Sequence, residues 1–162
     1  MMRFLLIVAL LMLLVYYLRT RRSSAGPPPS GPQGIRVGSI PGVLRQLAAA
    51  GAEGSFVVLI FRSPDADPAG DRVNLQLSIE DGRPGLDWVL LTSANVRDRE
   101  RFTRFAAELG HAVGAREMDE VPYLRVEDGD PAELAMRVMR DLYRLSPEDE
   151  VELLVEGFHA VL

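Results

Sequence analysis

Hydrophobic and polar positions between residues 37 and 162 follow two periods, and the shorter period predicts strands. Residues 56–61 (FVVLIF) are continuously apolar, which indicates a strand buried on both faces. In residues 73–79, apolar side chains alternate strictly with Asn74, Gln76 and Ser78, which predicts a strand with one apolar face and one polar, exposed face. Further apolar stretches predict four more strands, at residues 86–91, 112–118, 121–126 and 151–155.

Apolar residues at helical spacing, together with start and stop signals, predict three helices. The first follows Ser39, has a proline in its first turn, and ends at Gly51. The second is expected over residues 96–109, with Asn95 as its N-cap. The third begins at Asp130, which is expected to cap the helix because a proline follows it in the first helical position.

The order of these elements is α-β-β-β-α-β-β-α-β, and it decides the fold class. Short turns join most consecutive strands, which implies antiparallel pairing. A regular alternation of strand and helix, which a parallel dinucleotide-binding sheet requires, does not occur. We therefore expect residues 37–162 to form one α+β domain, with an antiparallel sheet and helices packed on it.

An uncharged run of 15 residues, 4–18, predicts one N-terminal transmembrane helix. Its length of about 22 Å is short for a hydrocarbon core of about 30 Å, so the arginines that flank it would have to extend toward the two surfaces. The alternative is a signal peptide cleaved after the small residues 23–25. The arginines between the run and that site favour an uncleaved anchor over residues 1–22.

Arginines also predict the orientation of this anchor. Arg19, Arg21 and Arg22 follow the run, whereas Arg3 and the terminal amine precede it. The positive-inside rule then places the C-terminal domain in the cytoplasm, on a single-pass protein of the cell inner membrane. Residues 23–36 are rich in proline and glycine and predict a linker between anchor and domain.

Charge divides the chain into two unlike parts. Residues 1–34 carry four arginines and no acid, whereas the remainder carries 14 arginines against 23 acids, a net charge of −9. An acidic domain repels phosphate backbones, which argues against a nucleic-acid partner. The absence of cysteine excludes disulfides, a thiol nucleophile and cysteine-ligated zinc.

The element order, size and acidity of residues 39–145 resemble the type III secretion chaperone-like superfamily, which includes the bacterial TY-Chap domains. The resemblance implies a domain that binds partner polypeptides on sheet and helix surfaces, often as a dimer, and does no chemistry. Secretion chaperones are soluble, whereas this chain has a predicted anchor. The last predicted strand also lies outside the shared core.

The candidate partner-binding surface combines the polar strand face with a neighbouring strand. Its residues are Asn74, Gln76, Ser78, Asp87 and Trp88. Asp87 interrupts an apolar run, and a carboxylate there needs a partner or a wet face. We expect an ion pair with Arg83 or another arginine, at an edge or groove position.

Two acidic clusters and two histidines contain residue types that can bind metals, but their positions favour simpler interpretations. The spacing of Asp65, Asp67 and Asp71 could hold a hard cation, but the glycine and the distal glutamate of an EF-hand loop are not at the required positions, so a solvated loop is favoured. Residues 127–130 are explained by a turn and a helix cap. His111 and His159 lie far apart in sequence. No catalytic residue, metal or cofactor is therefore expected.

Three hypotheses for function remain. The first is a membrane-tethered, non-enzymatic, chaperone-like domain that binds a polypeptide partner and contacts the lipid bilayer through residues 4–18, with a homodimer as an open alternative. The second is an enzyme that uses carboxylates such as Asp87 and Glu117 in a concave pocket. The third is a structural or inhibitory inner-membrane protein that acts through its anchor.

Overall fold

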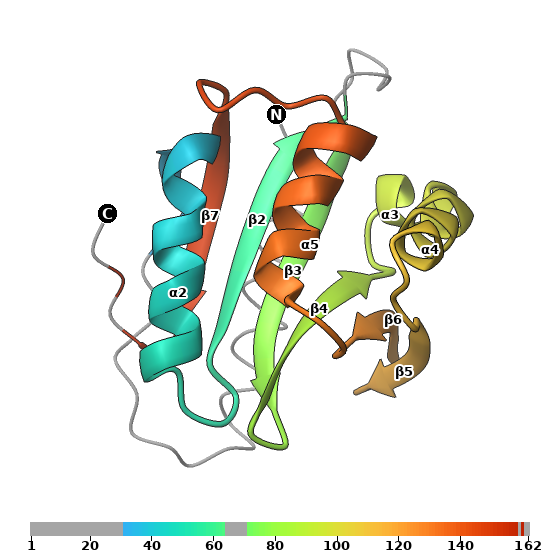
Figure 1. Cartoon of the computed structure of the whole chain (residues 1–162), viewed down its shortest axis with the longest axis horizontal. Helices are drawn as coiled ribbons and strands as arrows, with labels where there is room; N and C mark the ends of the chain where they lie inside the picture. Colours follow the sequence, from blue (N-terminus) through green and yellow to red (C-terminus); the bar gives the residue numbers. More distant parts are fainter. Residues whose placement is uncertain (1–30, 64–70, 159, 161–162) are drawn as a thin grey trace.

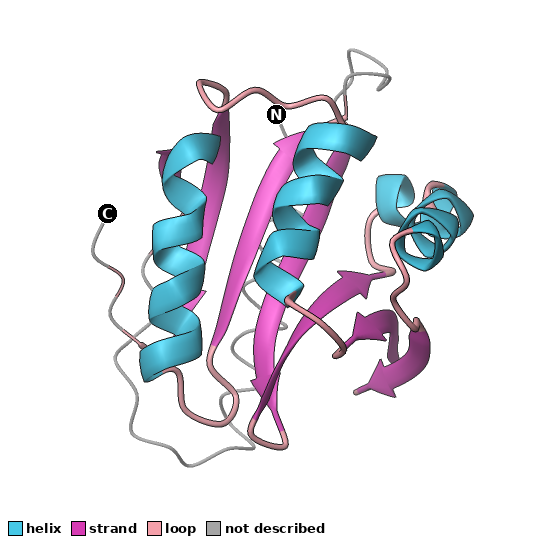
Figure 2. Ribbon diagram, viewed as in Figure 1, coloured by secondary structure: helices cyan, strands magenta, loops and turns pink. Residues whose placement is uncertain are grey.

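The computed structural model describes residues 31–63, 71–158 and 160, which form a seven-stranded antiparallel sheet with helices on one face (Figures 1 and 2). The expected α+β class with an antiparallel sheet is confirmed. Within these residues no helix has the length and apolar character needed to cross a membrane. The predicted anchor, residues 1–22, and the linker up to residue 30 lie outside the described residues, as does most of the loop predicted before Asp71.

The strands pair in the order β1-β7-β2-β3-β4-β6-β5. Their bounds are β1 Gln33–Arg36, β2 Phe56–Arg62, β3 Arg72–Glu80, β4 Arg83–Val89, β5 Gly114–Met118, β6 Val121–Val126 and β7 Glu150–Glu156. The helices are η1 Val37–Ser39, α2 Ile40–Ala50, α3 Ser93–Arg97, α4 Arg99–Glu108 and α5 Pro131–Arg137, which continues as the π-helical η2 Val138–Leu142.

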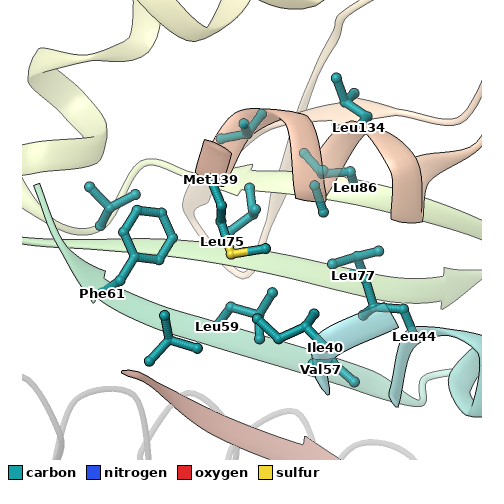
Figure 3. Close-up of a cluster of buried hydrophobic side chains, with 14 of the residues drawn as sticks. Ile40, Leu44, Val57, Leu59, Phe61, Leu75, Leu77, Leu86, Leu134 and Met139 are labelled. Atoms are coloured by element: carbon teal, nitrogen blue, oxygen red, sulfur yellow. The ribbon is translucent and has the colours of Figure 1, made fainter. Parts of the chain in front are cut away.

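The main core lies between the sheet and the helices. Because side chains alternate along a strand, every second residue of β2 points toward α2 and α5. Figure 3 shows this layer closely packed, with side chains from both helices, from η2 and from the central strands, namely Ile40, Leu44, Val57, Leu59, Phe61, Leu75, Leu77, Leu86, Leu134 and Met139. Burial of these apolar surfaces is the dominant favourable contribution to folding.

Trp88 anchors the part of this core beneath α4. Its side chain has no exposed surface, and its ring stacks on Phe102 with centroids 4.7 Å apart and planes 8° apart. The ring of Tyr143 lies 6.3 Å away, nearly parallel. The indole N–H donates a hydrogen bond of 2.9 Å to the backbone oxygen of Asn95. Trp88 therefore belongs to the core and not to a surface.

The first strand was not predicted. β1 lies within residues 23–36, which the sequence assigned to the linker, and it pairs with β7. Only Ile35 of its four residues is buried, so its sequence carries no alternation that would indicate a strand. β7, the last strand in the sequence, lies between β1 and β2.

The second predicted helix begins earlier than expected and is divided in two. Thr92, and not Asn95, caps α3, because its side chain accepts a hydrogen bond from the Asn95 N–H. The chain then passes through Asp98 into α4. By contrast, the third helix is capped as predicted, since Asp130 accepts hydrogen bonds from the N–H groups of Ala132 and Glu133.

Asn95 instead completes the hydrogen bonding of β3. Beyond the pair Gln76–Asp87, β4 turns away from β3 toward β6 (Figure 1). The Asn95 side chain takes the place of a neighbouring strand. Its Nδ2 donates to the backbone oxygen of Asn74 at 2.7 Å, and its Oδ1 accepts from the backbone N–H of Asn74 at 3.0 Å. Both backbone groups of Asn74 are thereby satisfied inside the protein.

Candidate functional site

The sheet has a second face, opposite α2 and α5. We call it the helix-free face because the helices of residues 31–63 and 71–158 do not pack on it. In Figure 2, α2 and α5 lie on one face of the sheet, and their apolar residues belong to the main core. A separate apolar cluster lies on the other face. The cluster comprises Phe56, Val58 and Ile60 of β2 and Leu154 of β7. Polar residues of β3, β4 and β6 continue the same face on one side of it. The face thus has an apolar half and a polar half.

A buried ion pair forms the centre of the polar half. Asp87 of β4 and Arg125 of β6 face each other across the two strands, with Nη1 and Oδ1 2.6 Å apart. Ser78 joins them, because its hydroxyl donates to Asp87 Oδ2 at 2.6 Å and accepts from Arg125 Nη1 at 2.8 Å. Both charged side chains are at most 1% exposed. Two complementary charges are therefore removed from water together.

Further charges surround the guanidinium of Arg125. Its Nε donates to Glu127 at 2.7 Å and lies 3.5 Å from Glu80. Arg116 of β5 contacts Glu127 at 3.0 Å. With Asp87, this makes three carboxylates and two guanidinium groups, which leaves one negative charge uncompensated within the cluster. The polar half is therefore weakly acidic.

Gly85 provides the space for this arrangement. It lies two residues before Asp87 on the same strand face, and a Cβ atom built there would come within 2.4 Å of the Arg125 Cζ and 2.5 Å of its Nη2. Real Cβ atoms do not approach other atoms so closely. The Arg125 side chain cannot easily move aside, because it is fully buried and hydrogen-bonded to three side chains. Glycine at position 85 is thus required by the guanidinium and not by the backbone.

Protonation behaviour reflects this burial. Burial raises the pKa of Asp87, and the nearby Arg125 charge and Ser78 hydroxyl offset only part of the rise. Burial also acts to lower the pKa of Arg125, but the Asp87 charge and the Glu127 hydrogen bond outweigh it and raise that pKa. The raised pKa of Asp87 favours a neutral carboxyl group, whereas the raised pKa of Arg125 favours a charged guanidinium. We take it as charged, since both Asp87 oxygens accept hydrogen bonds and arginine does not deprotonate in proteins.

Glu80 gives a testable pH dependence. Burial, and then the Asp87 charge, raise the pKa of Glu80. Because the folded state holds this proton more tightly than the unfolded state, the stabilisation is complete below the unfolded pKa and is lost as pH rises through the folded pKa. Glu80→Gln should therefore gain stability relative to the wild type between pH 4 and pH 8, measured by urea unfolding.

Glu127 is the matched control, with the opposite sign. The hydrogen bond from Arg125 holds the pKa of Glu127 below its usual range. Its contribution is present above the unfolded pKa and is lost as pH falls, so Glu127→Gln should lose stability relative to the wild type over the same rise in pH. Equal trends in the two variants would contradict the assignment for Glu80.

Most of the residues predicted to form an exposed binding surface are buried. Asn74, Ser78 and Asp87 are each at most 4% exposed, and Gln76 is half-buried, so the expectation of an exposed polar strand face is wrong. The physical reason is that Asn95 donates to Asn74 Oδ1, Arg125 donates to the Ser78 hydroxyl, and that hydroxyl donates to Asp87, so most of these polar atoms are satisfied inside the fold. Asn74 Nδ2 is buried without a hydrogen-bond partner. Trp88 lies on the opposite face of β4, in the core.

The position predicted for Asp87 was also wrong, whereas the predicted ion pair is confirmed. β4 lies between β3 and β6 and is not an edge strand. The partner of Asp87 is Arg125, and Arg83 contributes only its backbone oxygen, which accepts from Arg125 Nη2 at 3.2 Å. Glu117, the second carboxylate of the enzyme hypothesis, is exposed on β5 opposite Pro122. It does not share a site with Asp87.

Metal-ligand candidates in the described part of the chain are bound to other protein groups. His111 Nδ1 lies 3.2 Å from Asp128, and Asp71 contacts Arg97 at 2.7 Å. Asp65, Asp67 and His159 lie outside the described residues. Among residues 31–63, 71–158 and 160, no three His, Cys, Asp or Glu side chains are grouped so that they could hold a metal ion.

Arg125 and Gly85 were missed by sequence reasoning. One signal was available: Asp87 and Arg125 are charges of opposite sign, and each interrupts an apolar stretch of its strand. Two such interruptions are expected to pair if the strands are neighbours. The sequence did not show that β4 and β6 are neighbours, because β5 follows β4 in the chain and does not pair with it.

A pocket of about 470 Å³ adjoins the apolar half of the face. It lies where β1, β7 and β2 meet, and its lining includes Gly34, Ile60, Arg62, Arg72 and Glu152. Ile60 belongs both to this pocket and to the apolar cluster. The pocket therefore extends the helix-free face toward the β1 edge.

No protein-family model, curated protein or solved structure matches this chain.

Proposed function

We propose that this protein is a membrane-tethered, non-enzymatic domain that binds a polypeptide, with the helix-free face as its binding surface. The observation that carries the proposal is the separate apolar cluster of Phe56, Val58, Ile60 and Leu154 on the side of the sheet away from the described helices.

The composition of the face favours an apolar helix or strand as the bound segment. The polar half supplies fixed charges beside the apolar half, and fixed charges orient a partner more than they add affinity. Asp87 and Arg125 satisfy each other, which supports a structural role and not a catalytic one. The resemblance to chaperone-like domains, which bind polypeptides and do no chemistry, agrees with this proposal.

The predicted anchor and linker would place this surface near the membrane. Residues 4–18 would hold the chain in the inner membrane, and the basic residues after them would keep the domain on the cytoplasmic side. The acidic domain, with a net charge of −9, would be repelled by anionic lipid head groups. The face would then remain available to a protein.

Photo-cross-linking in cells tests the proposal. A photoreactive amino acid at position 58 in the full chain is expected to attach to a partner polypeptide, identified by mass spectrometry, at least ten times more than the same residue at position 48. Ala48 is the matched control because it is exposed on α2, on the other side of the sheet. Equal yields at the two positions, or no foreign polypeptide at position 58, would contradict the proposal.

A further inference from the structure

The pocket beside the apolar cluster is built on one row of the sheet. Gly34 of β1 lies opposite Glu152 of β7, and Glu152 lies opposite Ile60 of β2. Opposite residues of antiparallel strands point to the same face, and Ile60 belongs to the apolar cluster, so the whole row lies on the helix-free face. The pocket volume of about 470 Å³ is in the range of sites that hold small ligands.

Gly34 opens this pocket, and the fold itself gives no reason for a glycine there. Its backbone lies outside the left-handed region that favours glycine. Apart from its chain neighbours, no heavy atom of the described residues lies within 4 Å of a Cβ atom built at this position. Glycine weakens a strand, and in strands it often marks a place where a ligand approaches the backbone closely. Gly34 is therefore an independent indication of a ligand.

One arginine that lines the pocket has a charge that its neighbours do not compensate. Arg62 and Arg72 lie directly opposite each other on β2 and β3, where like charges repel. Glu152 contacts Arg72 at 2.5 Å. In the part of the chain that the structure describes, no carboxylate contacts the guanidinium of Arg62, which is exposed. An anion bound at Arg62 would relieve the repulsion between the two arginines.

The two remaining carboxylates among the described lining residues have other neighbours. Glu150 lies opposite Arg36 of β1, and Asp149 accepts a hydrogen bond of 2.6 Å from the backbone N–H of Ser146. Arg62 is therefore the charge at which an anionic group is favoured, although the domain as a whole is acidic. A guanidinium binds a carboxylate especially well, because its planar N–H groups match the two carboxylate oxygens.

We propose that this pocket binds the C-terminal end of a polypeptide, with Arg62 holding the terminal carboxylate and the last apolar side chain lying between Ile60 and Gly34. This inference rests on the proposed function, since it names the part of the partner that the helix-free face takes. Arg62 and Ile60 are two positions apart on one strand, about 7 Å. A chain end carries a carboxylate and an apolar side chain on the same residue, which an internal aspartate or glutamate does not.

Fluorescence anisotropy of a labelled heptapeptide tests the inference on the full chain in detergent. The peptide ends in leucine with a free carboxylate, and a second peptide of the same sequence ends in a carboxamide. We expect the free acid to bind at least about ten times more tightly, because hydrogen bonds between charged groups contribute at least this factor. Arg62→Gln should abolish the preference. Arg104→Gln, which changes an exposed arginine on α4, is the matched control and should retain it.

Gly34→Phe tests the pocket itself. A side chain at this position fills the space without a clash at its Cβ atom, so both peptides should bind about ten times more weakly while the domain stays folded. The matched control is Gly114→Phe on the other edge strand, β5, where a Cβ atom makes only an ordinary contact of 3.7 Å with a backbone oxygen. Trp88 fluorescence during urea unfolding verifies that each variant is folded.

Four results would overturn the proposal. Equal affinities for the acid and the amide would exclude recognition of the carboxylate, and unchanged binding in a folded Gly34→Phe variant would exclude the pocket. A free-acid peptide that does not bind at about 1 mM would exclude both. Sodium decanoate has a carboxylate on an apolar chain but no peptide group, so binding of decanoate without binding of the peptide would assign the pocket to a fatty acid instead.

The two proposals fail separately. If photo-cross-linking from position 58 captures a foreign polypeptide in cells but the acid and amide peptides bind equally, the function stands and the assignment of the pocket is wrong. If the free-acid peptide binds through Arg62 but position 58 captures no foreign polypeptide, the pocket recognises chain ends and the proposed function of the wider face is wrong.

Discussion

Replacing Asp87 with alanine is expected to lower the free energy of unfolding by about 3–5 kcal/mol, because it leaves a buried charge without its partner. Arg125 is fully buried, and its Nη1 loses a hydrogen bond of 2.6 Å to the carboxylate. Ser78 loses its acceptor at the same time. The measurement is urea unfolding of the full chain in detergent, followed by the fluorescence of Trp88, which is the only tryptophan.

Two comparisons identify the cause. Glu127→Ala removes a partner of Arg125 that is partly exposed, so its effect should be much smaller than that of Asp87→Ala. The double variant Asp87→Leu with Arg125→Met replaces both charges by apolar side chains and should recover most of the loss. A loss below about 1 kcal/mol for Asp87→Ala would show that the guanidinium reaches water, contrary to the structure.

Trp88→Ala is expected to cost about 3–5 kcal/mol, the range for truncating a large buried aromatic side chain. The substitution removes the ring that stacks on Phe102 and leaves a cavity beneath α4. It also leaves the Asn95 backbone oxygen without its donor. Since the variant lacks tryptophan, its unfolding should be followed by far-ultraviolet circular dichroism.

Trp88→Phe and Val96→Ala are the control variants against which the loss of stability in Trp88→Ala is compared. Phenylalanine keeps an aromatic ring against Phe102 but loses the hydrogen bond, so we expect a loss of about 1–2 kcal/mol. Val96 is 56% exposed, and its truncation should change stability by less than about 0.5 kcal/mol. If Trp88→Ala behaved like Val96→Ala, the ring would not belong to the core.

This prediction changes how Trp88 can be used in binding experiments. The sequence placed Trp88 near a partner surface and suggested that its removal would weaken capture without unfolding the domain. Because the ring lies in the core, any loss of binding in Trp88→Ala would follow from loss of structure. A substitution that tests binding therefore has to be made at a residue other than Trp88.

Local pattern was sufficient for most of the fold. The continuous run at residues 56–61 and the alternation at residues 73–79 predicted β2 and β3, and the Asp130 signal predicted the start of α5. β1 was missed because only one of its residues is buried and its partner, β7, lies at the far end of the sequence. Pairing between strands so far apart in the sequence produces no local pattern from which it could be predicted.

The candidate site was less predictable, because distant residues decide what is buried. Alternation correctly put Asn74 and Ser78 on the polar side of β3, and exposure was the natural inference. Their burial depends on Asn95, 21 residues from Asn74, and on Arg125, 47 residues from Ser78. Neither contact follows from the order of elements, since the sequence does not show that β4 and β6 are neighbours.

The position of β7 has a consequence for synthesis of the chain. β7 is translated last among the strands, yet it separates β1 from β2, and Gln33 lies about 120 positions along the chain from its partner Leu153. Until β7 leaves the ribosome, β1 has no strand to pair with and one edge of β2 is open. A nascent chain held at the membrane would therefore expose that edge throughout translation, when a chaperone or a second nascent chain can reach it.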